Sequence, residues 1–155
     1  IPHRFDWQAG TATPPPDWNS LPMKIADVLQ PLDQILVVRP DDIVATVADR
    51  FRLTGQSIAC VCIDRRLVGV VTGADLRLGD SDVQVRNVMT PRPVTCVASE
   101  STEQALDAMQ QHEVRSLPVV EKGQLVGLVS FADVLRRTRA QAKRDVEFLT
   151  AFVFG

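Results

Sequence analysis

Two short segments of the sequence place a hydroxyl and a carboxylate three residues apart, Thr72 with Asp75 and Ser130 with Asp133. Each hydroxyl follows a run rich in β-branched residues, so a strand is expected to give way there to a helix whose free N–H groups attract anions. The hydroxyl can then bond a phosphate oxygen, and the carboxylate can accept hydrogen bonds from both hydroxyls of a ribose. The spacing also fits a capping box, in which both side chains only satisfy the helix start. Taken alone, each segment favours capping.

Both segments belong to an internal repeat. Residues 67–76 align with residues 125–134 at an offset of 58, and the register runs without a gap from Val37 onward. Further upstream, residues 25–29 resemble residues 85–89, with two extra residues in the first copy. Agreement at a fixed offset over this length indicates two copies of one structural unit.

The two copies predict the same order of elements. Apolar residues at helical spacing indicate helices, and β-branched runs joined by short polar turns indicate hairpins. The expected elements are a short helix (24–29, 84–89), a strand (35–39, 93–97), a helix (42–54, 100–112), a hairpin (58–63 with 67–72, 117–120 with 125–130) and a final helix after residues 72 and 130. This β-α-β-β-α unit is too small to bury both faces of its sheet, so we expect an α+β fold in which two copies pack as a pseudo-twofold pair.

The repeated motif resembles the CBS domain family, named after cystathionine β-synthase. Its most specific part is a glycine, two apolar residues, a Thr or Ser, two further residues and an Asp, at residues 69–75 and 127–133. Residues 89–91 (Met-Thr-Pro) and 117–120 (Leu-Pro-Val-Val) are also similar to that family, and the resemblance covers residues 23–140. It implies a regulatory module that binds an adenine nucleotide (AMP, ADP or ATP), requires no cofactor and catalyses nothing itself.

The resemblance also implies which residues contact the ligand. The Thr or Ser of each motif would contact phosphate, the Asp would contact ribose, and the adenine would lie in an apolar slot near the first strand of each copy. The expected ligand-binding residues are Val37, Arg39, Thr72, Asp75, Thr95, Val97, Arg115, Ser116, Pro118, Ser130 and Asp133. Arg115 stands where related domains carry a phosphate-facing cation, whereas Ser57 takes its place in the first copy. We therefore expect unequal occupancy, with the second repeat favoured.

The two ends of the chain lie outside the repeats. We divide the chain into a Pro-rich N-terminal arm (1–22), a first repeat (23–82), a second repeat (83–140) and an apolar C-terminal helix (141–155). Aromatic residues in the arm and apolar residues at helical spacing near the end predict packing against the body or a partner chain. These residues are Phe5, Trp7 and Trp18 in the arm, and Phe148, Leu149, Phe152 and Val153 near the end. The resemblance further implies a homodimer whose state is read by an unidentified downstream protein.

Charge and composition narrow the function classes. A net charge of −2 and a pI near 5.6 do not indicate the basic surface that nucleic-acid binding requires. No apolar run approaches the roughly 18–20 residues that span a bilayer. The first residues of the sequence do not resemble a signal peptide, so we expect a cytoplasmic protein. Cys60 and Cys62 are expected in the apolar core and not in a metal site, and with Cys96 they make three cysteines, an odd number that does not indicate a disulfide framework. Because catalytic motifs are absent, the alternative to nucleotide sensing is an interaction scaffold in which the motif residues are caps only.

Overall fold

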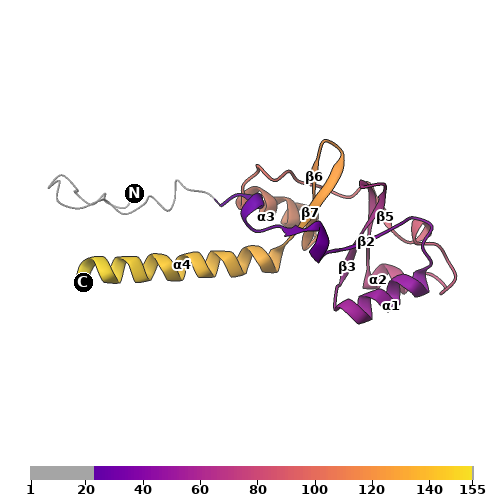
Figure 1. Cartoon of the computed structure of the whole chain (residues 1–155), viewed down its shortest axis with the longest axis horizontal. Coiled ribbons are helices and arrows are strands. Elements are labelled where there is room, and N and C mark those ends of the chain that lie inside the picture. Colours follow the sequence, from indigo (N-terminus) through magenta and orange to yellow (C-terminus); the bar gives the residue numbers. More distant parts are fainter. Residues whose placement is uncertain (1–22, 155) are drawn as a thin grey trace.

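The structure, a computed structural model, describes residues 23–154 apart from several side chains of the last helix, and it confirms the α+β fold (Figure 1). The strands are β1 (Gln30–Pro31), β2 (Leu36–Val38), β3 (Ile58–Ile63), β4 (Arg66–Thr72), β5 (Thr90–Pro91), β6 (Ser116–Glu121) and β7 (Gln124–Ser130). The helices are α1 (Val44–Thr54), α2 (Gly73–Leu76), α3 (Thr102–Gln111) and α4 (Phe131–Phe154), with short 3-10 turns η1 (Ile25–Asp27), η2 (Leu32–Gln34) and η3 (Val85–Asn87).

Each half is organised around an antiparallel hairpin, as the sequence predicts. β3 pairs with β4 and β6 pairs with β7, through turns at residues 64–65 and 122–123. All four turn residues have positive φ, the backbone geometry that matches the twist of two strands joined by a tight turn. β4 and β7 are neighbours in the sheet and pair at Arg66 and Gln124, directly after the two turns, so the hairpins meet at their turn ends.

The strand predicted at residues 93–97 does not form, and this prediction was wrong. Only Cys96 pairs with the neighbouring strand, in a single parallel bridge to Val119. The ladder does not extend because residue 93 is a proline without an N–H, and because the N–H of Val97 donates to Glu100 Oε1 at 2.8 Å. In the first half, β2 pairs with β3 along its whole length, so the two halves differ at this place.

The opening segment of each half packs on the other half. In residues 23–31, the N–H of Ile25 donates to the carbonyl of Glu100 at 2.9 Å, and β1 pairs with β7. In residues 83–91, the N–H of Val85 donates to the carbonyl of Asp42 at 2.8 Å, and β5 pairs with β4. The short helices expected in these segments are the 3-10 turns η1 and η3. This reciprocal exchange interlocks the halves as a pseudo-twofold pair.

Three apolar clusters hold the body together. Each half has its own core, which the exchanged opening segment of the other half completes. Val47 and Val71 of the first half pack with Val85, and Met109 and Leu117 of the second half pack with Ile25. The third cluster lies between the hairpins and contains Cys60, Cys62, Leu125 and Leu128. Cys60 and Cys96 are free thiols that pack in these clusters as small apolar groups, and this burial raises the pKa of each to about 12. Among the side chains that the structure describes, no group of three or more His, Cys, Asp or Glu is placed to hold a metal ion.

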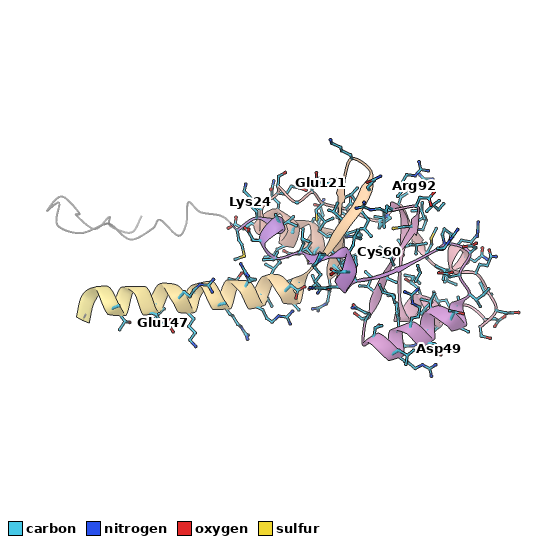
Figure 2. All side chains as sticks on the ribbon, in the orientation of Figure 1. Lys24, Asp49, Cys60, Arg92, Glu121 and Glu147 are labelled. Atoms are coloured by element: carbon cyan, nitrogen blue, oxygen red, sulfur yellow. The ribbon has the colours of Figure 1, made fainter. Side chains whose placement is uncertain are left out.

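The last helix, α4, is continuous and extends well beyond the body (Figure 1). Figure 2 shows Glu147 on this extension, whereas Cys60 lies inside the body. The apolar side chains that we expect to dock (residues 148, 149, 152 and 153) lie outside the described part of the chain, as do the aromatic residues of the N-terminal arm. None of the helices described is both long and apolar enough to cross a membrane.

Candidate functional site

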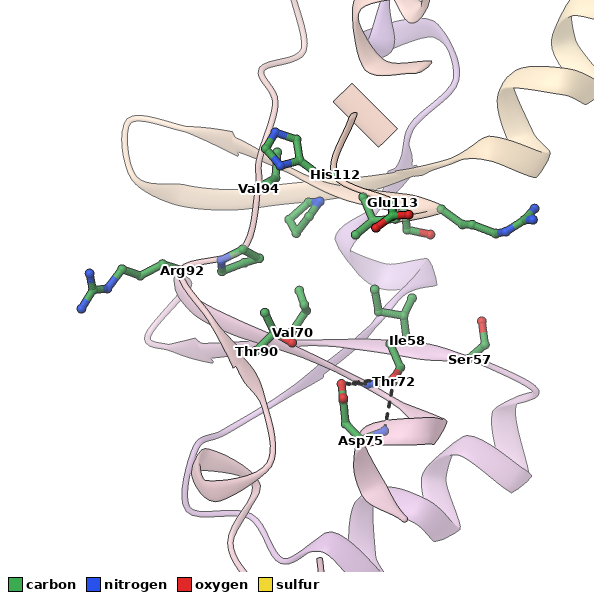
Figure 3. A pocket seen from close by; sticks show the side chains of 15 residues that line it. Ser57, Ile58, Val70, Thr72, Asp75, Thr90, Arg92, Val94, His112 and Glu113 are labelled. Atoms are coloured by element: carbon green, nitrogen blue, oxygen red, sulfur yellow. Dashed lines mark hydrogen bonds between the residues drawn. The ribbon is translucent and has the colours of Figure 1, made fainter. Parts of the chain in front are cut away.

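A cleft of about 530 Å³, here called the first cleft, opens between the two halves (Figure 3). One wall belongs to the first half and carries Ile58 at the start of β3, Thr72 at the end of β4 and Asp75 in α2. The opposite wall belongs to the second half and carries Val94 and His112. Figure 3 shows these two groups of side chains facing each other across the gap. The cleft therefore depends on the relative position of the halves.

Thr72 and Asp75 form a complete capping box at the start of α2. Asp75 Oδ2 accepts hydrogen bonds from the Thr72 N–H at 2.9 Å and from the Thr72 hydroxyl at 3.1 Å. The Asp75 N–H in turn donates to Thr72 Oγ1 at 3.3 Å. These bonds fix both side chains at the edge of the first cleft. Among the described residues, the hydrogen bonds that the Asp75 carboxylate accepts both reach the same oxygen, Oδ2.

The rest of the first cleft combines apolar surface with a few charged side chains. Ile58 from the first half and Val94 and Pro118 from the second supply apolar side chains on both sides. The charged lining residues are Arg92, Arg115 and the acidic Glu113, and Figure 3 shows the Arg92 side chain extending away from the gap. An apolar slot with a small number of polar groups is the usual composition of a site for a small organic molecule.

A second cleft, of about 330 Å³, is the pseudo-twofold counterpart and carries Ser130 and Asp133 at the junction of β7 and α4. The Asp133 N–H donates to Ser130 Oγ at 3.1 Å, which is one half of a capping box. The Asp133 carboxylate is engaged differently from that of Asp75. Gln30 Nε2 donates to Asp133 Oδ2 at 2.6 Å, and the guanidinium of Arg136 pairs with Oδ1.

Arg115 lines both clefts. Its guanidinium carbon lies 5.8 Å from the centre of the Phe131 ring, a cation–π distance, and its carbonyl accepts a hydrogen bond from the Phe131 N–H at 2.8 Å. Ser57, its counterpart in the first repeat, also lines both clefts but carries no charge. The boundary between the clefts is therefore asymmetric.

The structure brings seven of the expected ligand-binding residues into the two clefts. Thr72, Asp75 and Pro118 line the first cleft, Ser130 and Asp133 line the second, and Arg115 and Ser116 line both. The other four residues line neither cleft. Val37 packs into the cluster between the hairpins, Arg39 pairs with Asp41 at the surface, and Thr95 and Val97 are exposed.

Sequence reasoning did not place Gln30, Thr90, Val94 or Arg136 in a cleft. Gln30 and Thr90 belong to the exchanged opening segments, so each lies against the motif of the other repeat. A signal for them does exist, because the register that pairs residues 25–29 with residues 85–89 also pairs Gln30 with Thr90 when it is continued. Arg136 lies one helical turn after Asp133, a spacing at which two side chains can meet.

Comparison with known proteins finds relatives of this chain. A family model described as the CBS domain matches residues 25–79 and again residues 85–139, well over half of the chain. The chain is also 34% identical over 116 residues to an inosine-5'-monophosphate dehydrogenase of Korarchaeum cryptofilum, a match that covers 73% of this chain and 24% of that relative. The chain thus spans about a quarter of the length of this curated relative.

Solved structures share the architecture. The CBS-pair protein CBSX2 from Arabidopsis thaliana has a TM-score of 0.73 at 25% identity, over 80% of this chain and 99% of that chain. A complex of CBSX2 with AMP gives a TM-score of 0.70 at 25% identity, over 78% and 98% of the two chains. The cytosolic domain of the Mg²⁺ channel MgtE in complex with ATP gives a TM-score of 0.67 at 27% identity, over 74% and 48%.

Proposed function

Because this chain belongs to the CBS domain family, we propose that it is a regulatory module that senses an adenine nucleotide in the cleft between its two CBS repeats. Binding adds contacts between the repeats and shifts the population of their relative arrangements, and an unidentified partner protein reads that shift. We propose further that the module acts as a homodimer in the cytoplasm and catalyses nothing itself. The complexes of CBSX2 with AMP and of the MgtE domain with ATP support this class of ligand.

The observation that carries the proposal is the hydroxyl–carboxylate pair at the edge of the first cleft. The capping bonds of Asp75 use Oδ2, and among the described residues no hydrogen bond reaches Oδ1. A carboxylate offers about four lone-pair sites, so Asp75 keeps the capacity to accept both hydroxyls of a ribose while it caps α2. The Thr72 hydroxyl can turn its proton toward a phosphate oxygen and still accept from the Asp75 N–H.

The remaining groups of the first cleft suit the other two parts of a nucleotide. Ile58, Val94 and Pro118 offer apolar surface on both sides of the gap, which favours a flat purine ring. Arg115, which lines the first cleft, has a guanidinium that can form a planar, bidentate contact with phosphate. The volume of about 530 Å³ falls within the usual range for small-molecule sites, roughly 300–1,000 Å³.

The alternative is an interaction scaffold with the same fold and no nucleotide. The capping box of Thr72 and Asp75 favours it, because caps of this kind explain both residues without any ligand. The two functions differ in one measurable respect. A scaffold gains no stability from AMP, ADP or ATP, whereas a sensor does.

The test is a thermal-unfolding titration with AMP, ADP and ATP. A ligand at 100 times its Kd stabilises the folded state by about 2.7 kcal/mol. For a chain of this size we expect the Tm to rise by roughly 5–10 °C. Asp75→Asn should remove the rise, because the amide keeps one oxygen for the Thr72 N–H but loses the second acceptor that the ribose needs.

The matched control is Asp41→Asn, which removes the same charge from an exposed carboxylate outside both clefts. We expect this variant to respond to nucleotide as the wild type does. No rise in Tm for the wild type with millimolar nucleotide would leave the scaffold as the function. A full rise in Asp75→Asn would show that the first cleft is not the site.

A further inference from the structure

The two clefts differ in what already contacts the motif carboxylate. Both oxygens of Asp133 are engaged, Oδ2 by Gln30 Nε2 at 2.6 Å and Oδ1 by the guanidinium of Arg136. In the first cleft, Thr72 is the sole partner of the Asp75 carboxylate among the described residues, and it uses only Oδ2. A ligand therefore meets an available acceptor in the first cleft and an occupied one in the second.

The pseudo-twofold relation shows which residues cause this difference. The counterpart of Gln30 is Thr90, and the counterpart of Arg136 is Leu78. Figure 3 shows Thr90 on the same wall of the first cleft as Asp75, but the shorter side chain makes no hydrogen bond with that carboxylate in the described part of the chain. Leu78 has no side-chain donor and is 81% exposed. Neither bond to Asp133 has an equivalent at Asp75.

We infer that Gln30 and Arg136 occupy the positions on Asp133 that a ribose would take, so that the chain binds one adenine nucleotide, in the first cleft. This inference rests on the proposed function and adds the identity and number of the sites. It assigns Gln30 and Arg136 a role as specificity-determining residues. It also reverses the preference for the second repeat that the sequence suggests.

The two contacts contribute unequally. The bond from Gln30 is short, partly buried and made to a charged group, so its replacement by a ribose hydroxyl should weaken binding in the second cleft by roughly tenfold to a hundredfold. The side chain of Arg136 is 71% exposed, and an ion pair with one exposed partner adds little. The smaller volume of the second cleft, about 330 Å³ against 530 Å³, acts in the same direction.

The experiment is isothermal titration calorimetry with AMP on the whole 155-residue chain. The wild type should bind one AMP per chain. Gln30→Thr/Arg136→Leu gives the second cleft the residues of the first, and this variant should bind a second AMP. Adding Asp133→Asn to it should remove the second site again. The matched control is Gln34→Thr/Arg139→Leu, which makes the same replacements at exposed positions and should bind one AMP.

The reverse exchange tests the inference without disturbing a buried contact. Thr90→Gln/Leu78→Arg changes two exposed residues, and it should weaken AMP binding in the first cleft by about tenfold or more. This variant decides the question even if Gln30→Thr/Arg136→Leu does not fold.

The outcomes separate the inference from the proposed function. Two equivalent AMP sites in the wild type, an unchanged single site in Gln30→Thr/Arg136→Leu, or unchanged affinity in Thr90→Gln/Leu78→Arg overturns the inference alone. Binding that is lost in Asp133→Asn but kept in Asp75→Asn does the same. A wild-type chain that binds no AMP, ADP or ATP overturns the proposed function and the inference with it.

Discussion

Replacement of Gly127 by alanine tests the exchanged opening segment directly. Gly127 lies in β7 opposite Pro31 of β1. A Cβ at this position would lie 2.5 Å from the carbonyl oxygen of Gln30 and 2.8 Å from Leu29 Cδ1. The leucine can change its rotamer, but the carbonyl is backbone and can move only with the whole of β1. The absence of a side chain at residue 127 is therefore required for β1 to pair with β7.

The size of the effect follows from these distances. Ordinary contact begins at 3.4 Å, so β1 must move by about 0.9 Å, the difference between 3.4 and 2.5 Å. Overpacking of this kind destabilises the fold by about 1–3 kcal/mol. Alanine offsets about 0.5–1 kcal/mol of this, because glycine in a strand loses more conformational entropy on folding. We expect Gly127→Ala to lower the free energy of unfolding by about 1–2 kcal/mol in urea denaturation.

Gly73→Ala is the control for this measurement. Gly73 directly follows β4, and a Cβ there meets no atom within 4 Å. It lies at the start of a helix, so alanine should leave the stability unchanged or raise it by up to about 1 kcal/mol. If Gly127→Ala unfolds at the same urea concentration as the wild type, β1 does not pack on β7 as described, and the position of Gln30 loses its support.

Two further perturbations test the core. Burial raises the pKa of the Cys60 and Cys96 thiols from 9.0 to about 12, so the folded state holds these protons more tightly than the unfolded state. The free energy of unfolding should therefore fall as the pH rises from about 9 toward 12, and a Cys60→Ala/Cys96→Ala variant should show a smaller fall in urea titrations. Leu117→Ala, at a fully buried position, should cost about 2–5 kcal/mol, whereas Leu53→Ala, where the side chain is 85% exposed, should change stability by less than about 0.5 kcal/mol in the same assay.

The parts of the fold that the sequence predicts correctly have local signals. The hairpins show β-branched runs with turns between them, and α3 begins at a capping box of Ser101 and Gln104. The strand expected at residues 93–97 fails because a competing bond, from the Val97 N–H to Glu100, turns the chain away from the ladder. The exchange of the opening segments has no local signal, since it depends on contacts between residues far apart in the chain.

The residues of the candidate site likewise divide into those with a local sequence signal and those whose position depends on distant contacts. The motif residues were predictable because a strand–helix junction fixes their place, and all four line a cleft. The expected adenine slot is different. Val37 alternates with Leu36 and Val38 along β2, so its side chain enters the cluster between the hairpins while its neighbours enter the first core. Its contact with a ligand stays a prediction to which the clefts add no support.

The exchange of opening segments explains how two similar motifs can differ in function. Each motif carboxylate lies in a cleft that also holds a residue from the opposite repeat, Thr90 for Asp75 and Gln30 for Asp133. The motif therefore supplies the acceptor, and the other repeat decides whether that acceptor is available. A ligand at Asp133 would also have to break the bond that joins β1 to α4 through Gln30, whereas a ligand at Asp75 meets no such bond among the described residues. Divergence at residues 30 and 90 can thus change the number of ligands bound while both motifs stay intact.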